Sequence, residues 1–447
     1  MLMPVELCTV GGYSEVGRNM TAVKYKDEVV ILDMGLQMEK YITLTEDEDL
    51  VDLSAKKLMD HGAVPDLRKI DDWKEMVKAI VPGHAHLDHI GAIPFLGNKF
   101  KADILCTPFT KAVLESLFRN EDMTSRNPIK GLPVNSLFKV SPNIHIELIH
   151  TTHSTPQTAM IAVHTPDGIV LYTNDYKLDN TPVLGKPPNY ARLTELGKEG
   201  NVLAVVMDSL YSHDAKKTPS ESIARDMVKQ VLLETETKGK AIFFTTFSSH
   251  IARLKTAIEC GKKLNRKVVL MGRSLGRYVQ AAEQCGIVNF SKEVEMVQFG
   301  DKIRKKLRKY EKNKDKMLFV VTGHQGEQKA VLSKLAHGTI PFHFDPGDYV
   351  VFSNSVIPTP INRANRDALE SQLRKLSVRI FRDVHVSGHA SREDHRDLIT
   401  MVKPKNIIPS HCNLEMAGSM AELANEIGFK LGRNVHIMED GGRLKLG

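Results

Sequence analysis

The stretch AIVPGHAHLDH, residues 79–89, decides how this chain folds and what it can bind. Ala79 to Val81 form an apolar run typical of a buried strand, and four side chains able to bind a metal follow within six residues. Side chains alternate where a strand runs into a loop, so we expect His84 and His86 to point the same way and bind one cation. Asp88 and His89 lie past the bend and can bind a second one. A histidine-rich surface loop is the alternative interpretation, and so many ligands beside a buried strand disfavour it.

The ligand types in this stretch indicate which metal it would hold. Imidazole and carboxylate groups with no thiolate nearby suit Zn²⁺ first, and Mn²⁺ as a substitute that accepts more oxygen ligands. Two such ions, roughly 3.5–4 Å apart, are typical of enzymes that hydrolyse phosphate esters, because one activates water and both stabilise the developing charge. The stretch therefore predicts two Zn²⁺ ions per chain and hydrolytic chemistry.

The composition is that of a globular protein with room for two or more domains. The chain has 447 residues, of which 42% are hydrophobic and 26% charged. Its apolar stretches are short and a strand-like run begins at Val5, so we expect no signal peptide, no membrane span and a cytoplasmic location. The five cysteines form no C-x-x-C pair, which indicates reduced packing residues. The net charge of +7 favours a polyanionic partner without separating a nuclease from other basic enzymes.

Strand and helix signals change twice along the chain. Short strand signals dominate up to about residue 208, and the clearest are residues 29–33, 144–149, 159–163 and 169–172. From about 215 to 375, strands alternate with helices, which predicts a mostly parallel, doubly wound sheet. The strands of this part are predicted at 242–244, 268–270 and 317–321, and the helices after them from His250, Leu275 and Glu327.

Short strand signals return after residue 375. They lie at residues 380–381, 384–386 and 406–408, and a helix is predicted from Leu414 to about Ile427. The simplest arrangement is an α/β domain inserted within another domain, whose last strands and helices complete the first.

Two charged segments allow opposite interpretations. Asp301 to Lys316 contains nine Lys or Arg residues, with Ile303, Leu307 and Tyr310 at helical spacing. This predicts a helix with a buried apolar stripe and a solvated basic face, and a track for RNA is the alternative. The acidic run Glu46 to Asp49 is predicted to form an exposed lip that repels nucleic acid.

Two metals need more ligands than the stretch at 84–89 supplies. Three residues at predicted strand ends or in short loops are candidates: Asp33, His153 and Asp175. Side chains that follow strands converge at one edge of a sheet, so these residues can complete one site.

In this arrangement the chain resembles the metallo-β-lactamase superfamily, whose motifs are a strand-end Asp, H-x-H-x-D-H, a later His and a later Asp, here Asp33, residues 84–89, His153 and Asp175. It also resembles the β-CASP nuclease branch, with Asp208, His389 and His411 at that branch's further motif positions. The resemblance implies an α/β fold: a metallo-β-lactamase αββα sandwich with an inserted doubly wound α/β β-CASP domain. Residues 1–208 would begin the sandwich, 209–375 would form the inserted domain, and 376–447 would complete the sandwich.

Within this branch, four segments look most like the ribonuclease J family, in its compact archaeal form. They are GGYSEVGRNM at 11–20, TFSSH at 246–250, TGHQGE at 322–327 and HVSGH at 385–389. The chain departs from the family pattern at Ser249, where Asn is usual, at His324, where Ser is usual, and at residues 411–413, where His-Gly-Glu is usual. These departures bear on the substrate pocket and leave the metal ligands intact.

The resemblance also implies roles for the site residues. One zinc would be held by His84, His86 and His153, the other by Asp88, His89 and His411, with Asp175 bridging the two. Asp33 would orient this cluster from behind. Asp88, His89, Asp175, Asp208 and His389 are the implied catalytic residues, with His389 as general acid for the leaving 3′-oxygen, held by Asp208.

A pocket for a 5′-monophosphate is the second implied site. Hydroxyls and backbone amides in turns bind phosphates, and the implied contacts are Ser248, Ser249, His385, Val386, Ser387, Gly388 and His389. The alternative interpretation is that these serines and the glycine are ordinary turn residues.

Three hypotheses follow. The first is a zinc-dependent ribonuclease of the ribonuclease J type, a 5′-to-3′ exoribonuclease that acts on 5′-monophosphorylated single-stranded RNA, with endonuclease activity as an addition. The second is a β-CASP endonuclease for RNA 3′-end cleavage or DNA processing. The third is a non-catalytic RNA-binding scaffold, disfavoured because every ligand position is filled. The resemblance also implies a homodimer.

Overall fold

The computed structural model describes residues 4–46, 54–357 and 359–446. The chain forms two compact units. The first contains residues 1–180, 186–218 and 388–447, and the second contains residues 181–185 and 219–387. The second unit is therefore an insertion in the first. Most of the predicted acidic lip, residues 47–49, lies outside the described residues.

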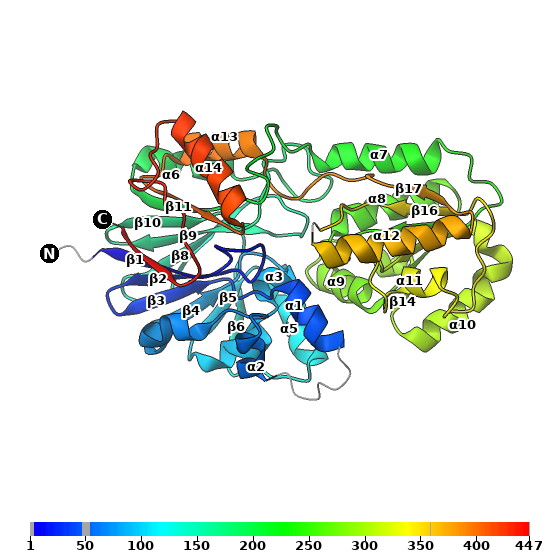
Figure 1. Cartoon of the computed structure of the whole chain (residues 1–447), viewed down its shortest axis with the longest axis horizontal. Helices are drawn as coiled ribbons and strands as arrows, with labels where there is room; N and C mark the ends of the chain where they lie inside the picture. Colours follow the sequence, from blue (N-terminus) through cyan, green and yellow to red (C-terminus); the bar gives the residue numbers. More distant parts are fainter. Residues whose placement is uncertain (1–3, 47–53, 358, 447) are drawn as a thin grey trace. The chain divides into compact units, whose positions relative to one another are not determined.

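The first unit is built on two sheets (Figure 1). The seven-stranded sheet has the order β19 (Gly442–Leu446), β1 (Val5–Gly11), β2 (Met20–Tyr25), β3 (Glu28–Leu32), β4 (Val77–Val81), β5 (Asp103–Cys106) and β6 (Ile129–Gly131). The six-stranded sheet has the order β18 (Ile407–Ser410), β11 (Val202–Asp208), β10 (Gly168–Tyr172), β9 (Ala159–Thr165), β8 (His145–His150) and β7 (Ser136–Lys139).

Alternating side chains of these strands form the core between the two sheets. Val30, Leu32, Ala79 and Val81 of the first sheet belong to the same buried cluster as residues of β8 to β11 of the second sheet. The residues of opposite parity in the second sheet pack against helices α6 (Tyr190–Glu199), α13 (Arg392–Val402) and α14 (Leu414–Glu426). The first sheet is contacted by the 3₁₀ segment Leu67–Met76 and by α5 (Pro108–Asn120). The predicted αββα sandwich is confirmed.

The first unit also contains four short helices in the connections from β3 to β4 and from β4 to β5. They are α1 (Met38–Glu46), α2 (Ala55–Asp60), α3 (Leu87–Ile90) and α4 (Ile93–Leu96). Helix α3 follows directly from His86, so it positions the second half of the metal-ligand stretch.

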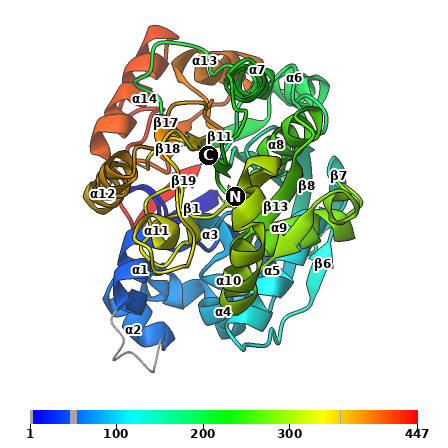
Figure 2. The same cartoon turned by 90° about the vertical axis from the view of Figure 1, so that its right-hand side faces the viewer.

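The second unit contains one six-stranded sheet in which every strand pair is parallel. The strand order is β14 (Glu295–Val297), β13 (Lys267–Met271), β15 (Met317–Val321), β12 (Ile242–Thr245), β16 (Tyr349–Phe352) and β17 (Arg379–Phe381). Its helices are α7 (Glu221–Leu233), α8 (Ile251–Lys263), α9 (Arg273–Gln284), α10 (Gly300–Tyr310), α11 (Val331–Ala336) and α12 (Pro360–Lys375), drawn in Figure 2 from another side.

Helices cover both faces of this sheet. Phe243, Val269 and Phe319 point to one face and share a buried cluster with residues of α10, α11 and α12. Val268 and Leu318 point to the other face, where they lie against Gly261 of α8. A parallel sheet covered on both faces is doubly wound, as predicted.

Two local predictions were wrong. Residues 384–386 form no strand, because the carbonyl of Val384 accepts hydrogen bonds from the side chains of Arg253 and Ser353 in place of a ladder. The helix expected from Glu327 begins only at Val331, because Gly326 has φ of +82° and continues a turn. Strand β17 lies past residue 375 and pairs with β16 in the sheet of the second unit.

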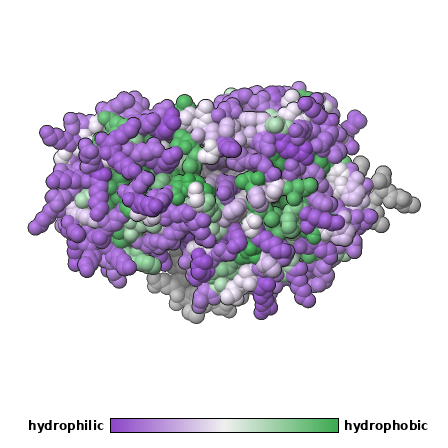
Figure 3. All heavy atoms as spheres, turned by 180° about the vertical axis from the view of Figure 1, so that it is seen from behind, coloured by the Kyte–Doolittle hydropathy of each residue, from purple (hydrophilic) through white to green (hydrophobic). Residues whose placement is uncertain are grey.

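Hydrophilic side chains cover most of the face drawn in Figure 3, with apolar residues in small groups among them. Cysteines 8, 106, 260, 285 and 412 are all free thiols, and all except Cys285 are buried. Among the described residues, no helix combines the length and the apolar character needed to cross a bilayer.

Candidate metal centre

The candidate ligands all follow carboxyl ends of strands at one edge of the sandwich. Asp33 follows β3, His84 and His86 follow β4, His153 follows β8, Asp175 follows β10, and His411 follows β18. Asp33, Asn174 and His411 have positive φ angles of 59°, 56° and 55°. Residues other than glycine rarely adopt this conformation, and it concentrates at functional sites.

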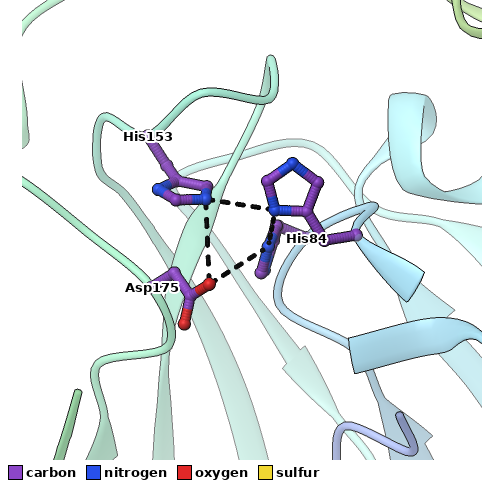
Figure 4. A group of neighbouring side chains, drawn as sticks. His84, His153 and Asp175 are labelled. Atoms are coloured by element: carbon purple, nitrogen blue, oxygen red, sulfur yellow. Dashed lines mark hydrogen bonds and ion pairs between the residues drawn. The ribbon is translucent and has the colours of Figure 1, made fainter. Parts of the chain in front are cut away.

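Three imidazoles and one carboxylate form the first cluster of ligands. The Nε2 of His84 and the Nε2 of His153 lie 2.9 and 3.2 Å from the Nδ1 of His86. The Oδ2 of Asp175 lies 3.5 Å from the Nε2 of His84 and 3.7 Å from that of His153. Figure 4 shows His84, His153 and Asp175 pointing toward one another.

The second cluster shares Asp175 with the first and adds Asp88, His89 and His411. The Nε2 of His89 lies 3.2 Å from the Oδ2 of Asp175 and 3.6 Å from the Oδ2 of Asp88. The Nε2 of His411 lies 3.8 Å from the same Asp88 oxygen. The structure thus brings together the two sets that the family resemblance implies, with Asp175 common to both.

The outer nitrogens of these rings show where their protons lie. The Nδ1 of His84 lies 2.9 Å from the amide oxygen of Asn174, and the Nδ1 of His153 lies 2.7 Å from the carbonyl of Gly388. Because both oxygens can only accept, each Nδ1 carries a hydrogen, and a neutral ring then turns a bare Nε2 lone pair inward. Lone pairs that converge on one point repel each other unless a cation lies between them.

The second cluster has the same construction. His89 Nδ1 donates to the Oδ2 of Asp33 over 2.7 Å, so its Nε2 faces Asp175. Asp33 also accepts from the hydroxyl of Tyr172 and from the backbone N–H of Gly83, at 2.7 and 2.8 Å. His411 Nδ1 contacts the side-chain amide of Asn19, at 2.8 Å from its nitrogen and 3.0 Å from its oxygen. The carbonyl or carboxylate behind His84, His153 and His89 is the usual support of a metal-binding histidine.

A buried oxygen further supports binding of a cation. The Oδ1 of Asp175 is buried and has no hydrogen-bond partner in the protein, although buried carboxylate oxygens are nearly always paired. The chemistry of the donors, imidazoles with carboxylates and no thiolate, suits Zn²⁺ or Mn²⁺. The residues therefore fit a metal centre.

Burial and nearby charges shift the pKa values of histidines in opposite directions in the two clusters. Burial lowers the pKa of His84 and His153 well below the usual value and that of His86 to about 4, so all three are neutral ligands at pH 7. Burial also opposes charge on His89, but Asp175, Asp33 and Asp88 together outweigh it and raise its pKa. Desolvation would raise the pKa of Asp175, but the surrounding histidines hold it well below its ordinary value.

A third group beside the clusters pairs a histidine with a carboxylate. His389 Nδ1 lies 2.8 Å from the Oδ2 of Asp208, and His389 Nε2 lies 3.9 Å from the Oδ2 of Asp175. Burial would lower the pKa of His389, but the charges of Asp208 and Asp175 raise it to about 9. The ring can therefore hold a proton at neutral pH, with Nε2 directed toward the ligands.

Gly388 lies directly against the ring of His153. Its carbonyl accepts from His153, and a Cβ at this position would lie 2.9 Å from atoms of the His153 ring and 3.1 Å from the backbone nitrogen of Ser154. Only glycine therefore fits against this ring.

The remaining predicted phosphate contacts belong to the second unit. Ser248 and Ser249 follow β12, and the hydroxyl of Ser248 lies 2.8 Å from that of Ser274. His385, Val386 and Ser387 follow β17, and His385 Nδ1 lies 3.4 Å from the guanidinium of Arg253.

Sequence reasoning missed three supporting residues: Asn19, Asn174 and Tyr172. Asn174 is adjacent to Asp175, and Asn19 lies in the quoted segment 11–20, so both were visible as polar residues at strand ends. Nothing in the sequence indicates that their side chains contact His411 and His84, since these contacts span 392 and 90 residues.

Comparisons with known families cover most of the chain. Residues 14–216 match the metallo-beta-lactamase superfamily, residues 239–369 match the beta-CASP domain of ribonuclease J, and residues 375–438 match a Zn-dependent metallo-hydrolase RNA specificity domain.

Curated relatives extend over the whole chain. It is 40% identical to a ribonuclease J of Methanocaldococcus jannaschii over 98% of both chains, and 40% identical to that of Pyrococcus abyssi over 98% of this chain and 96% of the relative. Ribonuclease J 1 of Streptococcus pyogenes is 30% identical over 99% of this chain and only 74% of its own. The lengths thus agree with the archaeal relatives.

A solved structure has the same fold. The crystal structure of a protein of unknown function from Enterococcus faecalis superposes with a TM-score of 0.66, covering 99% of this chain and 100% of its own, at 19% identity. This likeness concerns the fold alone.

Proposed function

This chain belongs to the ribonuclease J family, and on that premise we propose that it is a metal-dependent ribonuclease. The observation that carries the proposal is Asp175, whose carboxylate is shared by two complete sets of ligands and lies beside the Asp208–His389 pair. Two adjacent cation sites with one common carboxylate suit phosphodiester hydrolysis, in which charge develops on two oxygens at once.

We infer that the two sites hold Zn²⁺, with Mn²⁺ as a substitute. His84, His86 and His153 would hold one ion, and Asp88, His89 and His411 the other, with Asp175 common to both. When bound, such ions lower the pKa of water and stabilise negative charge on phosphate oxygens. The protein's own part is to hold His84, His153 and His89 in one tautomer through Asn174, Gly388 and Asp33, and to orient His411 through Asn19.

His389 is the residue that we propose delivers a proton to the leaving 3′-oxygen. Asp208 accepts from its Nδ1 and thereby keeps the ring charged and oriented, which leaves the proton on Nε2 for transfer. The side chains of His389 and Asp88 are 17% and 24% exposed, whereas those of His84, His89 and Asp175 are almost fully buried. Substrate would therefore reach the site on the side of His389 and Asp88.

The same proposal includes the polarity with which the RNA is degraded. We infer 5′-to-3′ exonucleolytic degradation of single-stranded RNA with a 5′-monophosphate, with internal cleavage as a secondary activity. Its support is the family membership together with the hydroxyls of Ser248, Ser249 and Ser387, which are able to donate to a phosphate.

The polarity can be tested with matched RNAs. A 30-nucleotide RNA labelled at its 3′ end is supplied with a 5′-monophosphate, a 5′-hydroxyl or a 5′-triphosphate. The expected result is stepwise shortening from the 5′ end that is fastest for the monophosphate. Equal rates for all three ends, or internal cuts alone, would contradict the exonuclease assignment, and preference for a matched DNA strand would replace RNA as the substrate.

The metal assignment needs its own test. Elemental analysis of the purified protein should find close to two equivalents of zinc or manganese, and chelation should abolish cleavage until the metal is restored. His86→Ala should lose bound metal and activity together. Full activity of this variant, or of the chelated protein, would exclude the proposed centre. The homodimer and the cytoplasmic location also stay predictions, which sedimentation and cell fractionation can test.

A further inference from the structure

The positive charge of this chain is concentrated in one short segment. Residues 301–316 contain nine Lys or Arg and three Asp or Glu, a net charge of +6, whereas the whole chain carries +7. All other residues together are therefore close to neutral, and any long-range attraction of a polyanion comes mainly from this segment.

The fold directs this charge outward. Ile303, Leu307 and Tyr310 of α10 are buried against the sheet of the second unit, with exposed fractions of 6% or less. Exposed basic side chains lie on the opposite side of the helix and just after it, and we call this surface the α10 basic face: Lys302, Arg304, Lys305, Arg308, Lys309 and, two residues past the helix end, Lys312. The helix is drawn at the outer margin of its unit in Figure 1.

The carboxylates near α10 pair mainly with lysines that lie outside the α10 basic face. Glu295 contacts Lys306 and lies 2.5 Å from Lys267, Glu293 lies 2.5 Å from Lys262, and Asp345 lies 2.9 Å from Lys314. On the α10 basic face itself, among the described residues, the ion pairs comprise a single long one, between Arg304 and the fully exposed Asp301 at 3.9 Å. The other five cations on this face have no such carboxylate in the described part of the chain.

An exposed aromatic ring adjoins these charges. Phe299 immediately precedes α10, is 57% exposed, and lies 5.7 Å from the Nζ of Lys302. Exposed aromatic rings beside lysines are the usual platform on which proteins stack unpaired bases while cations bind the phosphates.

We propose that the α10 basic face and Phe299 bind single-stranded RNA as a second contact, separate from the metal centre and independent of sequence. The proposal rests on the ribonuclease function proposed above and adds a surface for the body of the RNA. Lysines and arginines three and four residues apart on a helix are neighbours, so the face can follow several consecutive phosphates, and Phe299 can stack on one base.

Other partners fit this surface less well. A helix that lies on a membrane exposes a broad apolar face, but the apolar residues of α10 are buried. The centre of a protein interface is depleted in lysine, whereas this face is rich in it. A flexible polyanion with unpaired bases satisfies both the cations and the ring.

The test uses the full chain with four cations neutralised together: Lys302→Gln, Lys305→Gln, Arg308→Gln and Lys309→Gln. Glutamine has a similar helix propensity and an unbranched polar side chain without charge. The matched control neutralises four exposed lysines of the first unit, at positions 78, 101, 139 and 198. Binding of chelated, inactive protein to a 30-nucleotide RNA is measured across salt concentrations, and cleavage is measured on that RNA and on bis(p-nitrophenyl) phosphate.

The expected result is RNA affinity at least tenfold weaker at low salt for the α10 variant, with a salt dependence flatter by roughly three, since each lost contact in a single strand contributes about 0.7 to the slope. KM for the RNA rises accordingly, while kcat on bis(p-nitrophenyl) phosphate stays unchanged. The control variant should change the affinity less than threefold.

Phe299→Ala should weaken RNA binding roughly fivefold without changing the salt slope, because stacking is not ionic. The control is Leu137→Ala, because Leu137 is also an exposed apolar residue, with 60% of its surface accessible, and this variant should not change RNA binding.

The outcomes separate the two proposals. Cleavage of RNA by the wild type with unchanged affinity and slope in the α10 variant overturns the second contact and leaves the ribonuclease intact. Absence of RNA cleavage in the metal-loaded wild type overturns the ribonuclease itself. If the α10 variant binds RNA as the wild type does but no longer sediments with phosphatidylserine vesicles, the partner of this face is a membrane surface and not RNA.

Discussion

The metal centre of the first unit and the α10 basic face of the second unit both use charged side chains, but in opposite ways. In the metal centre, Asp175, His84 and His89 are almost fully buried, and each imidazole is held by a specific acceptor. On α10, the cations are exposed and few carboxylates hold them. A buried site depends on the position of each atom, whereas an exposed one depends on summed charge. Single substitutions should therefore have large effects in the first region and small, additive ones in the second.

The largest effect is expected for Asp175→Asn. The amide supplies neither the negative charge nor the second oxygen that both clusters share, so several kcal/mol of charge stabilisation is lost. We expect kcat to fall by at least about 10⁴-fold, with loss of bound metal by elemental analysis. Asp71→Asn, at an exposed carboxyl in the same unit, is the control and should keep both. Retention of more than a hundredth of the activity would show that Asp175 is not essential.

Single substitutions are expected to have large effects in the metal centre because its charges are buried, not because it belongs to the first unit. A buried charge in the second unit tests this explanation. Arg253 is fully buried, pairs with both oxygens of Glu221 at 2.7 and 2.8 Å, and also donates to Ser353 and Val384. Arg253→Met leaves Glu221 buried without this cation and should lower the free energy of unfolding by about 3–5 kcal/mol.

The two units can be followed separately in this measurement. Trp73 is the single tryptophan of the chain and lies in the first unit, so its fluorescence reports that unit while circular dichroism reports both. In urea denaturation, Arg253→Met should move the circular dichroism transition to lower urea concentration and leave the fluorescence transition in place. The double variant Arg253→Met with Glu221→Leu should recover part of the loss, and a single-variant cost below about 1 kcal/mol would refute the argument.

His389→Gln should lower kcat by about 10²- to 10³-fold, the usual contribution of a positioned proton donor. Since the pKa of His389 is raised to about 9, the donor is protonated below that pH, and activity should fall as the pH rises through it. Bound cations repel the imidazolium and move this limb to lower pH. The variant should lack the alkaline limb. A pH profile of kcat identical to that of the wild type would remove His389 from the proton transfer.

Gly388→Ala should reduce metal affinity and activity by about 10- to 100-fold, because the added Cβ pushes the ring of His153 from its place. Gly418→Ala is a matched control in α14, where nothing lies within 4 Å of an added Cβ. It should leave the activity unchanged and raise the free energy of unfolding by about 0.5–1 kcal/mol. Equal metal content in both variants would contradict the packing argument.

The smallest effect is expected for Lys305→Ala alone. One exposed cation among six should change RNA affinity less than about threefold and flatten the salt slope by about 0.7. The single substitutions at positions 302, 305, 308 and 309 should multiply to the effect of the fourfold variant, because exposed charges act nearly independently. One position that accounts for the whole loss would indicate a specific contact instead.

Much of the fold was predictable because it depends on local patterns. The alternation of strands and helices indicated the parallel sheet of the second unit, and apolar runs indicated β3, β4, β9 and β10 within one or two residues. The errors occurred where a distant contact overrides a local preference. Residues 384–386 have a strand pattern, yet the guanidinium of Arg253, 131 residues away, donates a hydrogen bond to the Val384 carbonyl.

The sequence by itself determined which chemistry the chain can carry, because the identity of a side chain sets its donors, charge and affinity for metals. Residues 84–89 implied cations, and residues 301–316 implied a polyanion or a solvated face. Tertiary structure alone decided how these groups act. It brought Asp175 between His84 and His89 and placed Asn174 and Gly388 behind the rings. It also buried Ile303 and Leu307 so that the cations of α10 face outward. Distances between residues far apart in the chain follow from packing of the whole core, which no local pattern records.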